Sequence, residues 1–167
     1  MAKKKTKKSN LGKILSFVAI VLGVVATAMI FVAAVKTPDV ELLGKTVKGE
    51  GLSGLKVAFG YSEDKLVGLS FSIFALLPYV LALAGAVLTA LNTFGKKNSK
   101  LFDFISIGAF VAAGIMFFLM PGFMVFADTL TGAALKLVEW ELAVGSIVAG
   151  ACAVLAGAAV IVKTFKK

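Results

Sequence analysis

Long runs of apolar residues alternate with short polar segments along the chain. Four of these runs are each about as long as a bilayer-spanning helix, which needs about 20 apolar residues. They cover residues 14–35, 69–92, 102–126 and 142–162. A chain of 167 residues is too short to bury four such runs in a soluble core. The pattern therefore predicts an all-α membrane protein, built as a four-transmembrane-helix bundle.

The polar segments divide the chain into a tail, a transmembrane domain and loops. Residues 1–13 are rich in Lys and are expected to be disordered, and residues 14–167 form the transmembrane domain. Loops at about 36–68 and 127–141 lie on the side of the membrane opposite the tail. A basic stretch before an apolar run is also typical of cleaved signal peptides, but their apolar region has about 7–15 residues. We therefore expect the first run to remain as a membrane span.

Positive charge is concentrated on one side of the predicted membrane. All 18 basic residues are Lys, and the net charge is +9. Twelve Lys lie in the two terminal segments and in the loop between the second and third spans, whereas the other two loops hold six Lys with eight of the nine acidic residues. Because cytoplasmic segments carry the excess of Lys, we expect a multi-pass plasma-membrane protein with both termini in the cytoplasm.

The first outer loop has a pattern of its own. Leu55, Val57, Phe59 and Tyr61 alternate with other residues, and a period of two is typical of a short strand. Residues 45–48 could pair with that strand across the Gly-rich segment 49–54, which would give a small extracellular cap with a short β-hairpin. An irregular loop on the membrane surface is an equally good interpretation.

Small residues recur at helical spacing within the spans. In the fourth span they are Gly145, Ala149, Ala153 and Gly157, and the same spacing occurs at Ala82, Ala86 and Ala90 and at Ala19, Gly23 and Thr27. Such stripes allow helix backbones to approach closely, either within one chain or between copies.

Pro78 and Tyr79 are candidates for a helix kink or a cavity. Pro removes a backbone donor inside the second span, so a kink is expected there. The Tyr79 hydroxyl then either lines a cavity or bonds a facing helix.

Candidate chemistry within the spans is sparse. Ionisable residues inside a membrane are the usual functional candidates, yet Asp103 is the only acid within the predicted spans. Its position at the start of the third span fits a helix N-terminus, where the dipole favours a carboxylate and the interface solvates it. Cys152 lies among Ala and Gly and is expected to be a packing residue. We therefore expect no catalytic, cofactor-binding or metal site, and no enzyme.

The layout of spans and loops resembles the claudin-like tetraspan proteins, which also have a longer first outer loop and a short second one. Gly51-Leu52-Ser53-Gly54-Leu55 is similar to part of that family's Gly-Leu-Trp stretch, whereas the loop lacks the family's Trp and paired Cys. The use of Lys without Arg, and the absence of Gln, also resemble small four-span proteins of low-GC bacteria.

These observations favour a non-enzymatic membrane protein with a structural or protein-interaction role, able to self-associate. The alternative is a small oligomeric channel or transporter subunit. The expected partners are the lipid bilayer, further copies of the chain, or another membrane or extracellular protein. Nucleic acid is not expected, because the Lys clusters lie at helix ends, where they contact anionic lipid headgroups.

Overall fold

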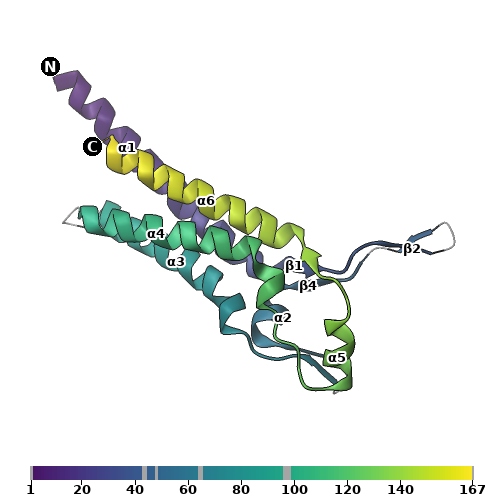
Figure 1. The fold of residues 1–167 in the computed structure, drawn as a ribbon. Helices are drawn as coiled ribbons and strands as arrows, with labels where there is room; N and C mark the ends of the chain where they lie inside the picture. The colour runs from purple at the N-terminus through teal and green to yellow at the C-terminus, as the bar shows by residue number, and fades with distance from the viewer. Residues whose placement is uncertain (1, 43–44, 48, 64–65, 96–98, 167) are drawn as a thin grey trace.

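Four long helices lie side by side in the computed structural model, which describes residues 2–42, 45–47, 49–63, 66–95 and 99–166 (Figure 1). They are α1 (Ala2–Ala28), α3 (Ile73–Phe94), α4 (Lys100–Phe118) and α6 (Val144–Phe165). Each holds a stretch long and apolar enough to cross a membrane, which confirms the predicted number of candidate spans. Both termini lie at one end of the bundle, which we call the terminus end (Figure 1).

The first helix departs from the predicted bounds at both ends. It begins at Ala2, so the segment expected to be disordered is helical from that residue onward. Lys and Ala both favour helix, and the adjoining apolar helix provides a nucleus for its extension. At the other end, α1 stops at Ala28, and Ala33–Lys36 form a strand, β1, after the short 3₁₀ turn Met29–Phe31. An apolar run does not by itself distinguish a buried strand from a helix.

The other spans also end where local backbone chemistry changes. The third expected span ran to residue 126, but α4 ends at Phe118 and a 3₁₀ turn, Met120–Phe123, follows it. Pro121 fits the start of this new turn but could not continue the preceding helix. The second expected span began at residue 69, whereas α3 begins at Ile73, after Ser72 caps it by accepting a hydrogen bond from the Ala75 amide.

The bundle packs around one aromatic ring. Helix α1 contacts α3 and α6, and α4 contacts the same two helices. Phe110 of α4 is fully buried. A Cβ added to Gly23 of α1 would lie 2.8 Å from the Phe110 ring, and a Cβ added to Gly85 of α3 would lie 3.0 Å from it. The ring therefore fills the space that these two glycines leave open.

The segments between α1 and α3 and between α4 and α6 form a cap at the end opposite the termini (Figure 1). Its centre is an antiparallel sheet with strand order β4-β1-β7. Strand β4 covers Gly51–Ser53 and β7 covers Glu141–Leu142. The other elements are α2 (Gly54–Phe59), β5 (Tyr61–Glu63), β6 (Leu66–Leu69) and α5 (Leu130–Lys136). Val35 of β1 is fully buried, so the sheet packs on the helices. The chain is thus mostly helical, with small sheets in the cap.

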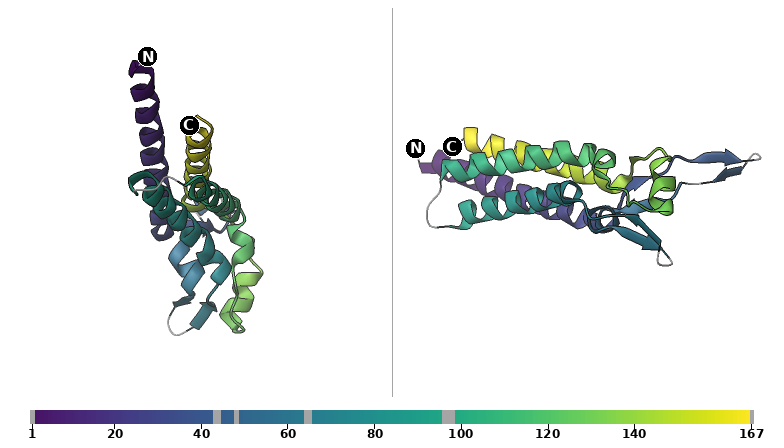
Figure 2. Two further views of the ribbon diagram at one scale, coloured as in Figure 1. Left: turned by 90° about the vertical axis from the view of Figure 1, so that its left-hand side faces the viewer. Right: turned by 60° about the horizontal axis from the view of Figure 1, so that its bottom comes forward.

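A two-stranded ribbon extends from this sheet beyond the rest of the molecule (Figure 2). It consists of β2 (Val40–Leu42) and β3 (Lys45–Val47). The register of the sheet continues into it, because Lys36 lies opposite Gly51 and Val40 lies opposite Val47. Between the two paired regions the Thr37 amide donates to the Glu50 carbonyl at 3.0 Å. Strands β1–β4 and β2–β3 are therefore the base and the tip of one long hairpin.

The predicted hairpin between residues 45–48 and 55–61 is wrong. Residues 54–59 form α2, and β3 pairs with β2 instead. Ser53 starts α2 by accepting a hydrogen bond from the Lys56 amide at 3.4 Å, and Gly60, with φ of 96°, ends it. Four alternating apolar residues are too few to outweigh these two helix boundaries.

Candidate functional site

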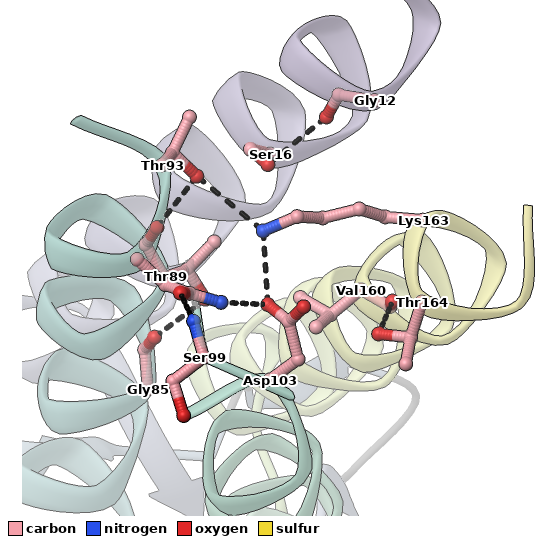
Figure 3. Close-up of polar contacts among 11 residues, drawn as sticks. Gly12, Ser16, Gly85, Thr89, Thr93, Ser99, Asp103, Val160, Lys163 and Thr164 are labelled. Atoms are coloured by element: carbon pink, nitrogen blue, oxygen red, sulfur yellow. Dashed lines mark hydrogen bonds and ion pairs between the residues drawn. The ribbon is translucent and has the colours of Figure 1, made fainter. Parts of the chain in front are cut away.

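Two opposite charges are buried together at the terminus end of the bundle. Asp103 of α4 is fully buried, and Lys163 of α6 is 4% exposed. The Lys163 ammonium lies 2.9 Å from Oδ1 of Asp103 (Figure 3). The expectation that Asp103 is solvated at an interface is therefore wrong, although the residue does lie in the first turn of α4.

Helix α3 completes what we call the polar cluster: Asn92, Thr93, Asp103 and Lys163. The Asn92 side-chain amide donates to Oδ1 of Asp103 at 2.6 Å, and its oxygen accepts from the Ser99 amide at 2.7 Å. The Lys163 ammonium also donates to the Thr93 hydroxyl at 3.4 Å (Figure 3). The cluster thus ties together α3, α4 and α6, and Asn92 also binds the N-cap residue of α4.

The helix ends stabilise both charges. Asp103 is in the first turn of α4, where the helix dipole favours an anion, and Lys163 is in the last turn of α6, where it favours a cation. Burying an ion pair still costs desolvation, so its net contribution to stability is small. Removing one partner is different, because the other charge then stays buried without compensation. The pair therefore joins α4 to α6 by a contact whose loss from one side alone would be costly.

The interior beyond the cluster is closed by an apolar side chain. Ser106 lies one turn deeper on α4, is buried, and has no hydrogen-bond partner for its hydroxyl within the described residues. Phe110 follows on the same face and is fully buried against α1 and α3. A polar path from the cluster into the bundle would need further hydrophilic side chains at this depth. The Phe110 ring occupies that place instead.

The small residues of α6 lie on contact surfaces within the chain. Gly145, Ala149, Ala153 and Gly157 are all buried. A Cβ at Gly145 would lie 2.5 Å from the Ala33 carbonyl oxygen of β1, and one at Gly157 would lie 3.4 Å from Cβ of Phe110. The stripe therefore faces the cap sheet at one end and α4 at the other.

Pro78 and Tyr79 are both buried inside α3. The Tyr79 ring packs edge-on to Phe117, with ring centroids 4.8 Å apart. Its hydroxyl approaches Gly54 of α2, where a Cβ would overlap it. In the described part of the chain this hydroxyl has no hydrogen-bond partner. Tyr79 thus fills the junction of bundle and cap.

The predicted cap residues divide into buried and exposed positions. Val57 is fully buried, whereas Leu55 and Phe59 are exposed on α2. Tyr61 is half-buried, and the Lys56 ammonium lies 4.5 Å from the centre of its ring. Phe59 lies beside Phe71, with ring centroids 6.1 Å apart. The helix α2 therefore presents one face to the cap and the other outward.

Nothing among the described residues suggests a metal centre, because no group of three or more His, Cys, Asp or Glu side chains is placed to hold an ion. Cys152 is half-buried in α6. No protein family, curated protein or solved structure matches this chain. The part of the predicted resemblance that the structure supports is the presence of four candidate membrane spans.

Helical spacing could have revealed the partner of Asp103. Ala149, Ala153, Ala156, Val160 and Lys163 follow one another at steps of three and four, so Lys163 falls on the buried face of α6. The position of Lys163 near other terminal Lys residues favours instead a solvated charge at the membrane surface. Helical spacing thus places Lys163 on the buried face, whereas its neighbours in the sequence place it at the surface. A Lys on a buried face needs an opposite charge beside it, and this need points to a buried pair.

Proposed function

We propose that this chain is a non-enzymatic, multi-pass protein of a bacterial plasma membrane, with a protein-interaction role carried by its cap. Both termini lie in the cytoplasm, and the β2–β3 ribbon extends outside the cell. The ribbon binds a neighbouring protein, either a second copy of the chain or another membrane or extracellular protein. One observation carries this proposal: the base of the long hairpin packs against a third strand and the helices, whereas its tip is a sheet of two strands.

The base of the hairpin is well supported by packing. Strand β1 has a neighbour on each side, β4 and β7, and both Val35 and Leu52 are buried. The backbone of the base is therefore held by a three-stranded sheet and by the helices beneath it.

The tip lacks this support. Strands β2 and β3 form a sheet of two strands, and each has no other strand partner in the described part of the chain. An isolated two-stranded hairpin is marginal in water, and its outer edges carry unpaired backbone donors and acceptors. A partner strand added to either edge would satisfy these groups. The ribbon therefore has the chemistry of a binding element.

Apolar side chains exposed on the cap support the same role. Leu130 is 91% exposed and Leu137 is 88% exposed, at opposite ends of the α5 segment. Phe59 also faces outward. Since these residues lie outside the four candidate spans, a contact with protein or with the membrane surface would be needed to shield them.

The orientation rests on charge. The terminal segments and the connection between α3 and α4 hold twelve of the 18 Lys, and the side of the membrane with more Lys is the cytoplasmic one. Four spans with a larger first outer segment resemble the claudin-like layout, and we propose the relationship at that level only.

A small oligomeric channel or transporter subunit is the second candidate. The buried Asp103–Lys163 pair favours it, because charges inside a membrane often mark transport pathways. Phe110 occupies the centre of the single bundle, so a pathway would have to run between chains. Flux through reconstituted proteoliposomes that Asp103→Asn abolishes would favour this second function.

The ribbon can be shortened without touching its base. Thr37 and Glu50 are already hydrogen-bonded across the hairpin, so residues 38–49 can be replaced by Asn-Gly, a preferred two-residue turn. Full-length and shortened chains are compared for oligomeric state and for co-purifying protein in mild detergent. We expect the wild type to assemble and the shortened chain to remain folded but alone.

A substitution on the cap outside the ribbon segment, Glu139→Gln, is the matched control and should leave assembly intact. The proposal is wrong if the wild type is a partner-free monomer, or if the shortened chain assembles as well as the wild type.

A further inference from the structure

A groove lies between α1 and α3 at the terminus end of the bundle. Its volume is about 530 Å³, and it is lined by Lys13, Ile14, Phe17, Val18, Thr93 and Phe94. We propose that it binds one anionic phospholipid of the cytoplasmic leaflet, with the headgroup phosphate at Lys13 and an acyl chain along Phe17. This inference rests on the membrane location proposed above.

The walls of the groove suit an acyl chain. Four of the six lining residues are apolar, and the groove is open, since Phe17 is 63% exposed and Phe94 is 76% exposed. The lining residues of α1 fall within its candidate membrane span, Asn10–Phe31. In a bilayer the apolar ones, Ile14, Phe17 and Val18, therefore contact hydrocarbon rather than water.

The polar end of the groove favours a negative headgroup. Lys13 supplies an ammonium near the start of the candidate span, which begins at Asn10. The terminal segments and the α3–α4 connection hold no acidic residue, and Asp103, in the first turn of α4, is already paired with Lys163 at 2.9 Å. No carboxylate of those segments is therefore left to neutralise Lys13 in place of a lipid phosphate.

The floor of the groove connects it to the polar cluster. The Thr93 hydroxyl donates to the Thr89 carbonyl at 2.7 Å and accepts from the Lys163 ammonium at 3.4 Å. Lys163 thus lies one hydroxyl away from the groove, but Asp103 already neutralises its charge, so Lys13 is the cation that the groove offers. A free phosphate ion would gain this one charge but would also face four apolar walls, so a lipid fits the groove better.

The test places a fluorescent reporter in the groove. The chain has one Trp, Trp140, in the cap. Phe17→Trp in a Trp140→Phe background therefore gives a single emitter beside the groove. The full chain is reconstituted in symmetric phosphatidylcholine bilayers that contain brominated phosphatidylglycerol or brominated phosphatidylcholine at equal mole fraction, and quenching of the reporter is measured.

We expect the anionic lipid to quench the groove reporter more strongly than the zwitterionic lipid. Lys13→Gln should lower the relative affinity for the anionic lipid by about fivefold, since one Lys near the surface contributes on the order of 1 kcal/mol. Lys13→Arg should restore the preference, which separates loss of charge from misfolding. Inorganic phosphate in solution should not compete.

Two matched controls test the location. Lys166 is exposed at the same end and does not line the groove, so Lys166→Gln should leave the preference unchanged. A reporter at Ile105, which is exposed on α4 and does not line the groove, should show little preference. Equal quenching by both lipids at the groove, or equal losses for Lys13→Gln and Lys166→Gln, would overturn the inference. Because the bilayers are symmetric and the ribbon is unchanged, a negative result leaves the proposed ribbon interaction untouched.

Discussion

Replacing Lys163 by Met should leave the Asp103 carboxylate buried beside an apolar side chain. The carboxylate is fully buried and the ammonium that faces it is 4% exposed, so water cannot take the place of the lost charge without opening the bundle. Breaking a buried ion pair from one side costs about 3–5 kcal/mol. We therefore expect Lys163→Met to lower the free energy of unfolding by about that amount.

The double variant Asp103→Asn/Lys163→Met provides the critical comparison. It removes both charges and retains a side-chain oxygen at position 103, which can still accept the hydrogen bond that Asn92 gives to Oδ1 of Asp103 at 2.6 Å. Exchanging a buried pair for neutral groups is often close to neutral. We expect the double variant to be within about 1 kcal/mol of the wild type, well above the single variant.

The assay is reversible unfolding in mixed detergent micelles, followed by far-ultraviolet circular dichroism. Lys166→Met is the matched control, because Lys166 is exposed at the same end of α6. If Lys163→Met unfolds like this control, or if the double variant is as unstable as the single one, the loss of stability does not come from an uncompensated buried charge and the prediction is wrong.

Three further predictions concern packing and the cap. Gly85→Ala should lower the free energy of unfolding by about 1–3 kcal/mol, because its Cβ would lie 3.0 Å from the Phe110 ring at the bundle centre. A Cβ at Gly108 would meet nothing within 4 Å, so Gly108→Ala should cost little. Equal effects of the two variants in detergent unfolding would contradict this packing. Tyr79→Phe should raise the free energy of unfolding by about 1 kcal/mol, because the hydroxyl is buried with no hydrogen-bond partner in the described part of the chain, and a loss of stability would refute that reasoning. Val57→Asp should speed hydrogen exchange across residues 51–61, because Val57 is fully buried, while Lys56→Asp should not, and matching exchange rates would mean that α2 is not docked.

The number of candidate spans could be predicted from the sequence, because each apolar run is long and differs sharply from its flanks. Their ends could not, because the same apolar residues continue into other elements. Ala34 and Val35 extend the first run but are buried in a sheet. The alternation at residues 55–61 predicted a strand. Residues 54–59 form a helix instead, which starts at the Ser53 cap and ends at Gly60, where φ is positive.

The small-residue stripe of α6 was predictable as a packing surface, but what it contacts was not. Gly145 meets the Ala33 carbonyl of a strand, and Gly157 meets Phe110 of another helix. The polar cluster was missed because two rules compete at Lys163. The rule that Lys marks the cytoplasmic surface treats this residue as solvated, whereas its helical spacing places it on the buried face.

Site-specific photo-crosslinking from the ribbon tests the proposed interaction role most directly. A photoreactive amino acid at position 46, within β3, is activated in intact cells that express the full chain, and position 139 on the cap is the comparison site. We expect a discrete protein adduct from position 46, with a second copy of the chain or with another protein, that position 139 does not form. The absence of any protein adduct at position 46, or the same adducts from both positions, would contradict the claim that the ribbon is the binding element.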